Sequence, residues 1–225
     1  GVKYGIIYLP KFYIDFENKD SRDAAKDVAI EVERLKKEGV KGIIMDVRDN
    51  GGGSLKTVVD ITGLFIEQGP VVQIKSAGSR KEVLFDRDPQ VQWDGPLVVM
   101  VNNFSASASE ILAGSLQDLD RAVVIGETSY GKGLVQRTYD LKYGSKIKIT
   151  IAKYYTPSGR CVQRLEYYDK ENGEKAKAEM KPGAWLVSLE FEAAELKPSA
   201  KTEASPNRPV WLYQAPFTGQ SRETR

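Results

Sequence analysis

The chain has 225 residues, 41% of them hydrophobic, and its 33 basic and 31 acidic side chains give a formal net charge of +2. A chain of this length can bury one substantial core, and the balanced charge shows no footprint of a nucleic-acid or membrane surface. The single cysteine, Cys161, excludes an internal disulfide, and the lack of histidine removes the usual zinc and copper ligands and every Ser/His/Asp mechanism. A hydrolase built on this chain therefore needs a base other than histidine.

The predicted elements interleave strands and helices. Runs rich in β-branched residues predict strands, and apolar residues spaced three and four apart predict helices. In chain order we expect a strand over 3–9, a helix over 21–38, a strand over 40–47, a glycine loop over 50–53, a helix over 55–66, strands over 70–75, 82–85 and 96–101, a helix over 108–119, and strands over 122–125, 134–139 and 146–155. Such interleaving is typical of an α/β fold.

The composition changes near residue 177. Ala, Glu, Lys, Pro and Ser accumulate and apolar periodicity is lost, so we expect a core domain over 1–176 and a poorly ordered tail over 177–225. The apolar runs, such as 97–101, fall far short of the roughly 18 to 20 residues of a membrane helix, and no leader pattern precedes them. We therefore expect no membrane span.

A serine cluster over 105–109 follows a predicted buried strand and opens a predicted helix. The free amides at a helix N-terminus favour negative charge, so a nucleophile at Ser107 would have an oxyanion site beside it. The same residues have a simpler interpretation, because Ser107 followed three residues later by Glu110 is a capping box. Spacing alone favours the capping interpretation.

Lys132 lies in a glycine-rich loop, for which three interpretations stay open. Gly126, Gly131 and Lys132 match a phosphate-binding loop, but Gly133 stands where Ser or Thr should bind magnesium, and a strand pattern follows where a helix is needed. Alternatively, burial would lower the pKa of a lysine from about 10.4 and make it a general base. A surface lysine in a turn is the ordinary alternative.

Two further patterns are less specific. Ser145 and Lys148 have the spacing of a penicillin-binding motif, but a strand places residues three apart on opposite faces, so we interpret both as solvated. The glycine run 51–53 is either a flexible turn or an anion-binding loop, and turns are the commoner use.

Four blocks of sequence together carry more information than any single motif. They cover 8–16, 46–53, 105–113 and 126–136, and a further stretch over 154–160 follows them. In order and content these blocks resemble the carboxyl-terminal processing peptidases, or tail-specific proteases, which are Ser/Lys peptidases of family S41. The resemblance implies an α/β core related to the Clp and crotonase superfamily.

The resemblance also implies roles for individual residues. Ser107 matches the family nucleophile and Lys132 the general base. Gln136 matches a glutamine that orients the lysine amine in some members, and Asp118 matches an acidic residue with a supporting role in others. No metal or organic cofactor is required for this chemistry.

The oxyanion hole of such a site would be built from backbone amides. The resemblance implies the amide of Ala108 and that of either Gly52 or Gly53, and the sequence leaves the choice of glycine open. Neutral lysine would take the serine proton, the alkoxide would attack a peptide carbonyl, and the lysine ammonium would protonate the leaving amine.

The function implied is an endopeptidase that cuts unfolded or C-terminally tagged proteins near their C-termini. The substrate would lie extended against the sheet, with no nucleic-acid partner, and the oligomeric state stays open. The resemblance implies a bacterial cell envelope or periplasm. Most members carry a PDZ module before the region where this chain begins, and neither that module nor the family's C-terminal elements are recognisable here.

The alternative is a peptide-binding remnant that has kept the fold without catalysis, since a fold does not establish activity. An acyl-CoA enzyme of the crotonase type would need neither Ser107 nor Lys132, and a P-loop NTPase would need nucleotide.

Overall fold

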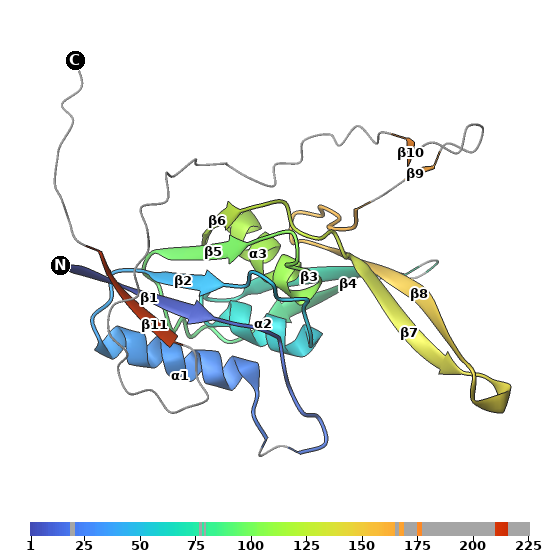
Figure 1. Ribbon diagram of the computed structural model, residues 1–225, viewed down its shortest axis with the longest axis horizontal. Coiled ribbons are helices and arrows are strands. Elements are labelled where there is room, and N and C mark those ends of the chain that lie inside the picture. Colours follow the sequence, from blue (N-terminus) through green and yellow to red (C-terminus); the bar gives the residue numbers. More distant parts are fainter. Residues whose placement is uncertain are drawn as a thin grey trace.

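The computed structural model describes residues 1–18, 21–76, 78, 80–164, 167–168, 175–176 and 210–215. Its larger sheet has the strand order β11-β1-β2-β5-β6 (Figure 1). The strands are β1 (Val2–Tyr8), β2 (Ile43–Asp46), β5 (Leu97–Val101), β6 (Val123–Gly126) and β11 (Val210–Ala215). Strands β1, β2, β5 and β6 run parallel to one another, whereas the edge strand β11 is antiparallel to β1.

Three helices pack on the sheets. They are α1 (Ala24–Lys37), α2 (Leu55–Gly63) and α3 (Ala108–Asp118). Helix α1 contacts β1 and α2, whereas α2 and α3 contact each other and strand β3, and α3 also contacts β5 and β6. The apolar positions predicted for α1 are its buried ones: Ala24, Ala25, Val28, Val32 and Leu35. The core therefore lies between the helices and the two sheets.

A second, antiparallel sheet has the strand order β4-β3-β8-β7. Its strands are β3 (Gly69–Ser76), β4 (Glu82–Asp86), β7 (Leu134–Asp140) and β8 (Lys146–Tyr155). The 3₁₀ turn η1 (Lys142–Gly144) joins β7 to β8 in a hairpin that projects well beyond the body of the molecule (Figure 1). The short strands β9 (Tyr167–Tyr168) and β10 (Lys175–Ala176) form a two-stranded antiparallel sheet.

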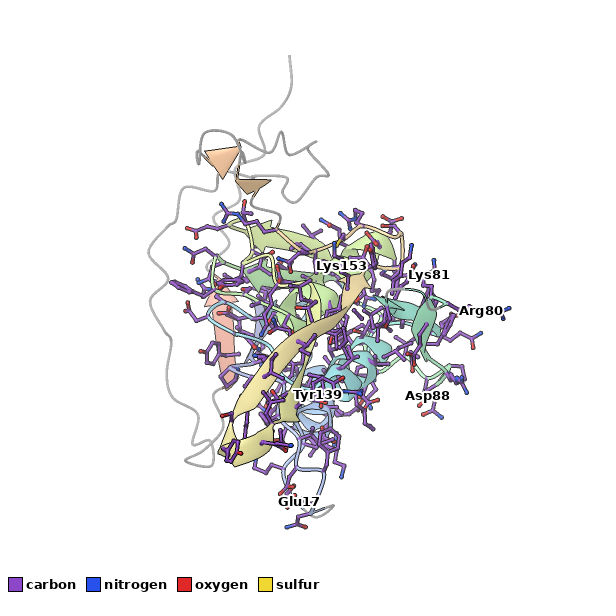
Figure 2. All side chains as sticks on the ribbon, turned by 90° about the vertical axis from the view of Figure 1, so that its right-hand side faces the viewer. Glu17, Arg80, Lys81, Asp88, Tyr139 and Lys153 are labelled. Carbon is purple, nitrogen blue, oxygen red and sulfur yellow. The ribbon has the colours of Figure 1, made fainter. Side chains whose placement is uncertain are left out.

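The projecting hairpin is a two-faced ribbon. Tyr139 is opposite Ile147, and Thr138 is opposite Lys148, so apolar and polar side chains alternate between its faces. Figure 2 looks toward the side on which the hairpin projects, and it labels Tyr139 on the ribbon and Lys153 nearer its base. Large side chains on the hairpin, such as Tyr139, remain exposed.

The α/β fold predicted from the sequence is confirmed, and every predicted strand and helix of the first 155 residues is present. The bounds of most elements differ from the expected ones by one to three residues, and capping contacts explain the differences for two helices. Helix α1 begins after Asp23 because the Asp23 carboxylate accepts from the amide of Ala25 at 2.8 Å. Helix α2 ends early because the amide of Leu64 turns to the carbonyl of Ile61 at 3.2 Å.

In the tail over 177–225, the structure describes only Val210–Ala215, which forms β11. The other residues of 177–225, for which we expected poor order, lie outside the part of the chain that the structure describes. No helix in the described part of the chain is long and apolar enough to cross a membrane.

Candidate active site

Three loops meet at one edge of the larger sheet. They follow β2, β5 and β6, which are adjacent and parallel. Because the carboxyl ends of neighbouring parallel strands lie at the same edge, loops 47–54, 102–107 and 127–133 are brought together. These loops carry the predicted oxyanion glycines, the predicted nucleophile and the predicted base.

Ser107 stands at the turn from β5 into α3 with an uncommon backbone conformation. Its φ is 58° and its ψ is −112°, a region that residues other than glycine seldom occupy. Such strain persists where the surrounding structure imposes it, and it resembles the strand-to-helix turn that presents catalytic serines. Ala108 then opens the helix, and its amide makes no hydrogen bond within the described residues. The half-buried Ser107 thus sits beside a free amide.

The glycine loop after β2 packs directly on this turn. A Cβ on Gly52 would lie 2.8 Å from the Cβ of Ser107 and 3.0 Å from the amide nitrogen of Ala108, and Gly52 has a φ of +101°. Only glycine fits there. The amide of Gly52 donates to the Asn50 side chain at 2.8 Å, whereas the exposed amide of Gly53 has no partner among the residues described.

Asn50 fixes the glycine loop in place and was missed from the sequence. It is fully buried, and its side-chain amide donates to the carbonyl of Leu9 at 2.7 Å. Its own carbonyl accepts from the amide of Ala106 at 3.0 Å and from the hydroxyl of Ser109 at 2.8 Å. One residue therefore ties β1, the glycine loop and the Ser107 turn together.

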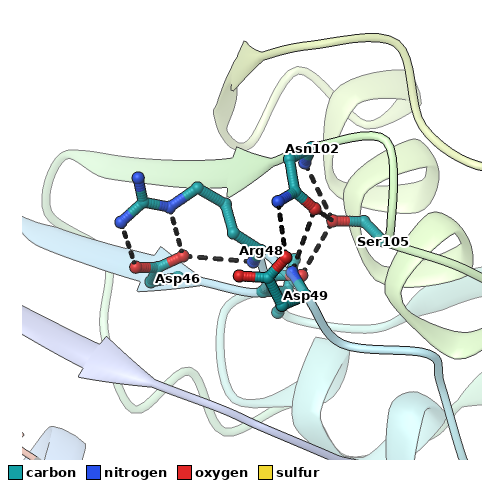
Figure 3. Close-up of polar contacts among 6 residues, drawn as sticks. Asp46, Arg48, Asp49, Asn102 and Ser105 are labelled. Atoms are coloured by element: carbon teal, nitrogen blue, oxygen red, sulfur yellow. Dashed lines mark hydrogen bonds and ion pairs between the residues drawn. The ribbon is translucent and has the colours of Figure 1, made fainter.

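A second set of contacts joins the loops after β2 and β5 (Figure 3). Asp49 donates its amide to the Asn102 side chain at 2.9 Å, and the Asn102 side-chain amide donates back to the Asp49 carboxylate at 2.9 Å. The hydroxyl of Ser105 donates to the carbonyl of Val47 at 2.8 Å. Figure 3 also shows Asp46 pairing with the guanidinium of Arg48 at the end of β2.

Glu110 links the nucleophile turn to the lysine loop. Its carboxylate, 1% exposed, accepts from the amides of Ser107 at 2.8 Å, Gly131 at 2.6 Å and Lys132 at 2.8 Å, and from the hydroxyl of Ser129 at 2.7 Å. The Ser107 contact is the capping bond that the sequence predicted. The three contacts to 129–132 were not predicted, because only the folded chain brings that loop to α3.

Lys132 itself is exposed, and its amine makes no hydrogen bond or ion pair to any residue that the structure describes. The described residues therefore do not bury the lysine amine. Gln136 is exposed on β7, and its side chain contacts the Thr150 hydroxyl at 3.4 Å. The structure brings the backbones of Ser107 and Lys132 together through Glu110 but does not desolvate the lysine amine.

Asp118 lies at the far end of α3, where it holds a turn. Its carboxylate pairs with the guanidinium of Arg160 and accepts from the amide of Ser158 at 2.8 Å. Burial raises its pKa, but hydrogen bonds from Ser158 and Thr156 and the charge of Arg160 outweigh this, so the net pKa lies below its ordinary value. These contacts give Asp118 a structural role in the 156–160 turn.

The match to a known family covers most of the described core. Residues 3–167 match peptidase family S41. The chain belongs to this family.

Relatives of this S41 chain bear names that describe processing at carboxyl termini. A carboxyl-terminal-processing protease of Synechocystis is 39% identical over 165 residues, which are 73% of this chain and 36% of that protein. A tail-specific protease of Haemophilus influenzae is 38% identical over 171 residues, 72% of this chain and 24% of that protein. The chain thus spans well under half the length of these curated relatives.

A solved structure agrees with the sequence relatives. The photosystem II D1 C-terminal processing protease superposes with a TM-score of 0.63 at 34% identity, over 71% of this chain and 39% of that one. A mature CPAF structure, with a TM-score of 0.59 at 12% identity, shares the fold.

Proposed function

We propose that this S41 chain carries the catalytic machinery of a serine endopeptidase in which Ser107 is the nucleophile and Lys132 the general base. The observation that carries the proposal is the strained turn at Ser107, which Glu110 joins to the backbone of the Lys132 loop. A purely structural cap would need neither the strained φ nor the second loop.

In this proposal two free amides hold the oxyanion. They belong to Ala108 and Gly53, because the amide of Gly52 already donates to Asn50. Gly52 instead shapes the floor beside Ser107.

The reaction proceeds through an acyl-enzyme. Neutral Lys132 accepts the hydroxyl proton of Ser107 as the serine oxygen bonds to the scissile carbonyl carbon. The C–N bond then breaks, and the lysine ammonium returns the proton to the leaving amine. Water, deprotonated by the same amine, hydrolyses the ester and restores the hydroxyl.

In this proposal the bound substrate removes water from the lysine amine. Lys132 is exposed in the described residues, so in this proposal a bound polypeptide covers its amine and excludes water from it. An extended segment of an unfolded or C-terminally tagged protein provides such a cover. The names of the relatives, which describe processing at carboxyl termini, agree with this substrate class. A bacterial envelope or periplasmic setting is part of the same proposal.

The exposure of Lys132 also favours one alternative, a peptide-binding remnant without turnover. In that case the loops bind an extended peptide, but the amine of Lys132 stays in water and does not act as a base.

Cleavage of casein separates the two functions. The purified chain is assayed beside Ser107→Ala and Lys132→Ala from about pH 6 to 10, and both variants should lose activity that in the parent rises with pH. Labelling by a fluorophosphonate reports the nucleophile independently. Binding of casein peptides without cleavage or labelling would establish the remnant and overturn the peptidase.

A further inference from the structure

A hollow of about 710 Å³ lies between the loop after β5 and the loop after β6, the two loops that carry Ser107 and Lys132. It is lined by 103–104, 128–131 and 163–164, and we call it the aromatic hollow after its two aromatic side chains, Phe104 and Tyr130. Phe104 is 61% exposed and Tyr130 is 56% exposed, so both rings present apolar surface to whatever enters. We propose that the aromatic hollow is a substrate subsite that takes a large apolar side chain next to the scissile bond; this rests on the proposed function.

The position of the hollow supports this assignment. Phe104 precedes Ser107 by three residues on the loop after β5, and Tyr130 precedes Lys132 by two on the loop after β6. The amide of Tyr130 donates to the carbonyl of Ser105 at 3.0 Å, which joins these two loops directly. A peptide whose carbonyl reaches Ser107 therefore places a neighbouring side chain within reach of the hollow.

The floor of the hollow is fixed before any substrate binds. The amide of Arg164 donates to the carbonyl of Gly131 at 2.9 Å, and the amide of Gly133 donates to the side chain of Gln163 at 2.9 Å. Glu110 holds the amide of Gly131 from the other side at 2.6 Å. Because these bonds involve backbone groups, the shape does not depend on the aromatic rings, and the rings can be removed without collapse of the floor.

The chemistry of the lining indicates the kind of side chain that fits. Two exposed rings favour contact with apolar or aromatic groups, which bury surface against them at about 25 cal/mol per Å². Apart from Gly131, the rest of the lining is polar; it includes the cation of Arg164 and, in the part of the chain described, no Asp or Glu. The hollow therefore favours a large apolar side chain over a basic one.

The test compares cleavage profiles of the whole chain and two variants. Casein fragments produced by the parent, Phe104→Ala and Tyr130→Ala are identified by mass spectrometry, and kcat/KM is measured with peptides that carry Phe, Gly or Lys at the favoured position. We expect enrichment of large apolar residues at one position beside the cut. Each variant should lower kcat/KM for the Phe peptide about tenfold and leave the Gly peptide unchanged.

Matched controls are Phe85→Ala on β4 and Tyr143→Ala at the hairpin tip, which remove exposed rings elsewhere. Both should keep the parent profile. An unaltered profile in Phe104→Ala and Tyr130→Ala, or the absence of any apolar preference in the parent, would overturn the assignment.

The experiments distinguish a wrong subsite assignment from a wrong assignment of peptidase activity. Full fluorophosphonate labelling of Ser107 in both ring variants shows that the catalytic groups are intact. If the parent neither labels nor cuts, fluorescein-labelled peptides with one Phe or one Gly are titrated against Ser107→Ala. The Phe peptide should bind about tenfold more tightly, and adding Phe104→Ala should abolish this difference. Equal binding of both peptides would reject the subsite by itself.

Discussion

The carboxylate of Glu110 is buried and forms no ion pair with any residue that the structure describes, a situation that is costly unless hydrogen bonds compensate. Three backbone amides and one hydroxyl supply that compensation. Because those donors come from two loops, Glu110 fixes the backbones of Ser107 and Lys132 relative to each other.

Replacing Glu110 with Gln should distinguish its role in positioning the Ser107 and Lys132 backbones from its contribution to the stability of the fold. A neutral amide presents one acceptor oxygen, so at least one of the amides of Ser107, Gly131 and Lys132 loses its partner. We expect kcat to fall about 100-fold with a smaller change in KM, and the free energy of unfolding to fall by about 1–3 kcal/mol. Steady-state kinetics and urea unfolding measure the two effects. The exposed Glu82→Gln is the control, and a Glu110→Gln enzyme with parental kcat would refute the positioning role.

We predict that the contribution of Asp118 to the stability of the folded chain depends on pH. Its pKa is lower in the folded state than in the unfolded chain, so its stabilisation is present above the ordinary value of about 3.9 and is lost as the pH falls through the folded value. Asp118→Asn should cost about 2 kcal/mol at pH 7 and progressively less below about pH 4. Denaturant unfolding from pH 7 to 3 tests this, with the exposed Asp140→Asn for comparison. A constant difference across that range would contradict it.

At the scale of elements, helix α3 is fastened at both ends. Ser107 and Glu110 hold its beginning, and Arg121 follows its end. The Arg121 guanidinium donates to the carbonyls of Phe65 at 2.7 Å, Trp93 at 2.7 Å and Gly95 at 2.9 Å. These bonds attach the end of α3 to the segment after α2 and to the turn before β5.

Arg121→Met should loosen this attachment without altering the chemistry at Ser107. Three partly buried carbonyls lose their donor, so we expect the free energy of unfolding to fall by about 2–3 kcal/mol. Labelling of Ser107 by a fluorophosphonate should proceed at the parental rate. Arg137→Met on the exposed hairpin should leave stability unchanged, and a comparable loss in both variants would argue against the three-carbonyl attachment.

The elements could be predicted from sequence because buried parallel strands read as apolar runs and α1 shows a clear helical period. The meeting of Ser107 and Lys132 followed only from the family resemblance. The contacts of Glu110 to 129–132 depend on loops that close over long sequence separations. No local pattern records such contacts. The exposure of Lys132 agrees with the surface lysine in a turn that the sequence left open as the ordinary alternative.

At the scale of the whole molecule, Asn50 connects segments from three strands. It contacts Leu9 after β1, Gly52 in the loop after β2, and Ala106 and Ser109 after β5. Asn50→Ala removes only the side-chain bonds, to Leu9 and Gly52. We expect faster amide exchange not only over 50–53 but also over 102–109, because these loops support one another.

Hydrogen exchange followed by mass spectrometry checks that coupling. The control is Asn103→Ala, an exposed residue on the same loop as Ser107. Faster exchange confined to 50–53 would show that the loops open independently.

The Glu110 carboxylate accepts hydrogen bonds from the backbone amides of Ser107 and Lys132, not from their side chains. The scaffold is therefore indifferent to which side chains it displays at these two places. Over evolutionary time a lineage can lose the nucleophile or the base by substitution and still keep the loop arrangement that would bind a peptide. Loss of catalysis and loss of architecture are separable events in this fold, and an inactive descendant would be expected to keep its glutamate after its serine has gone.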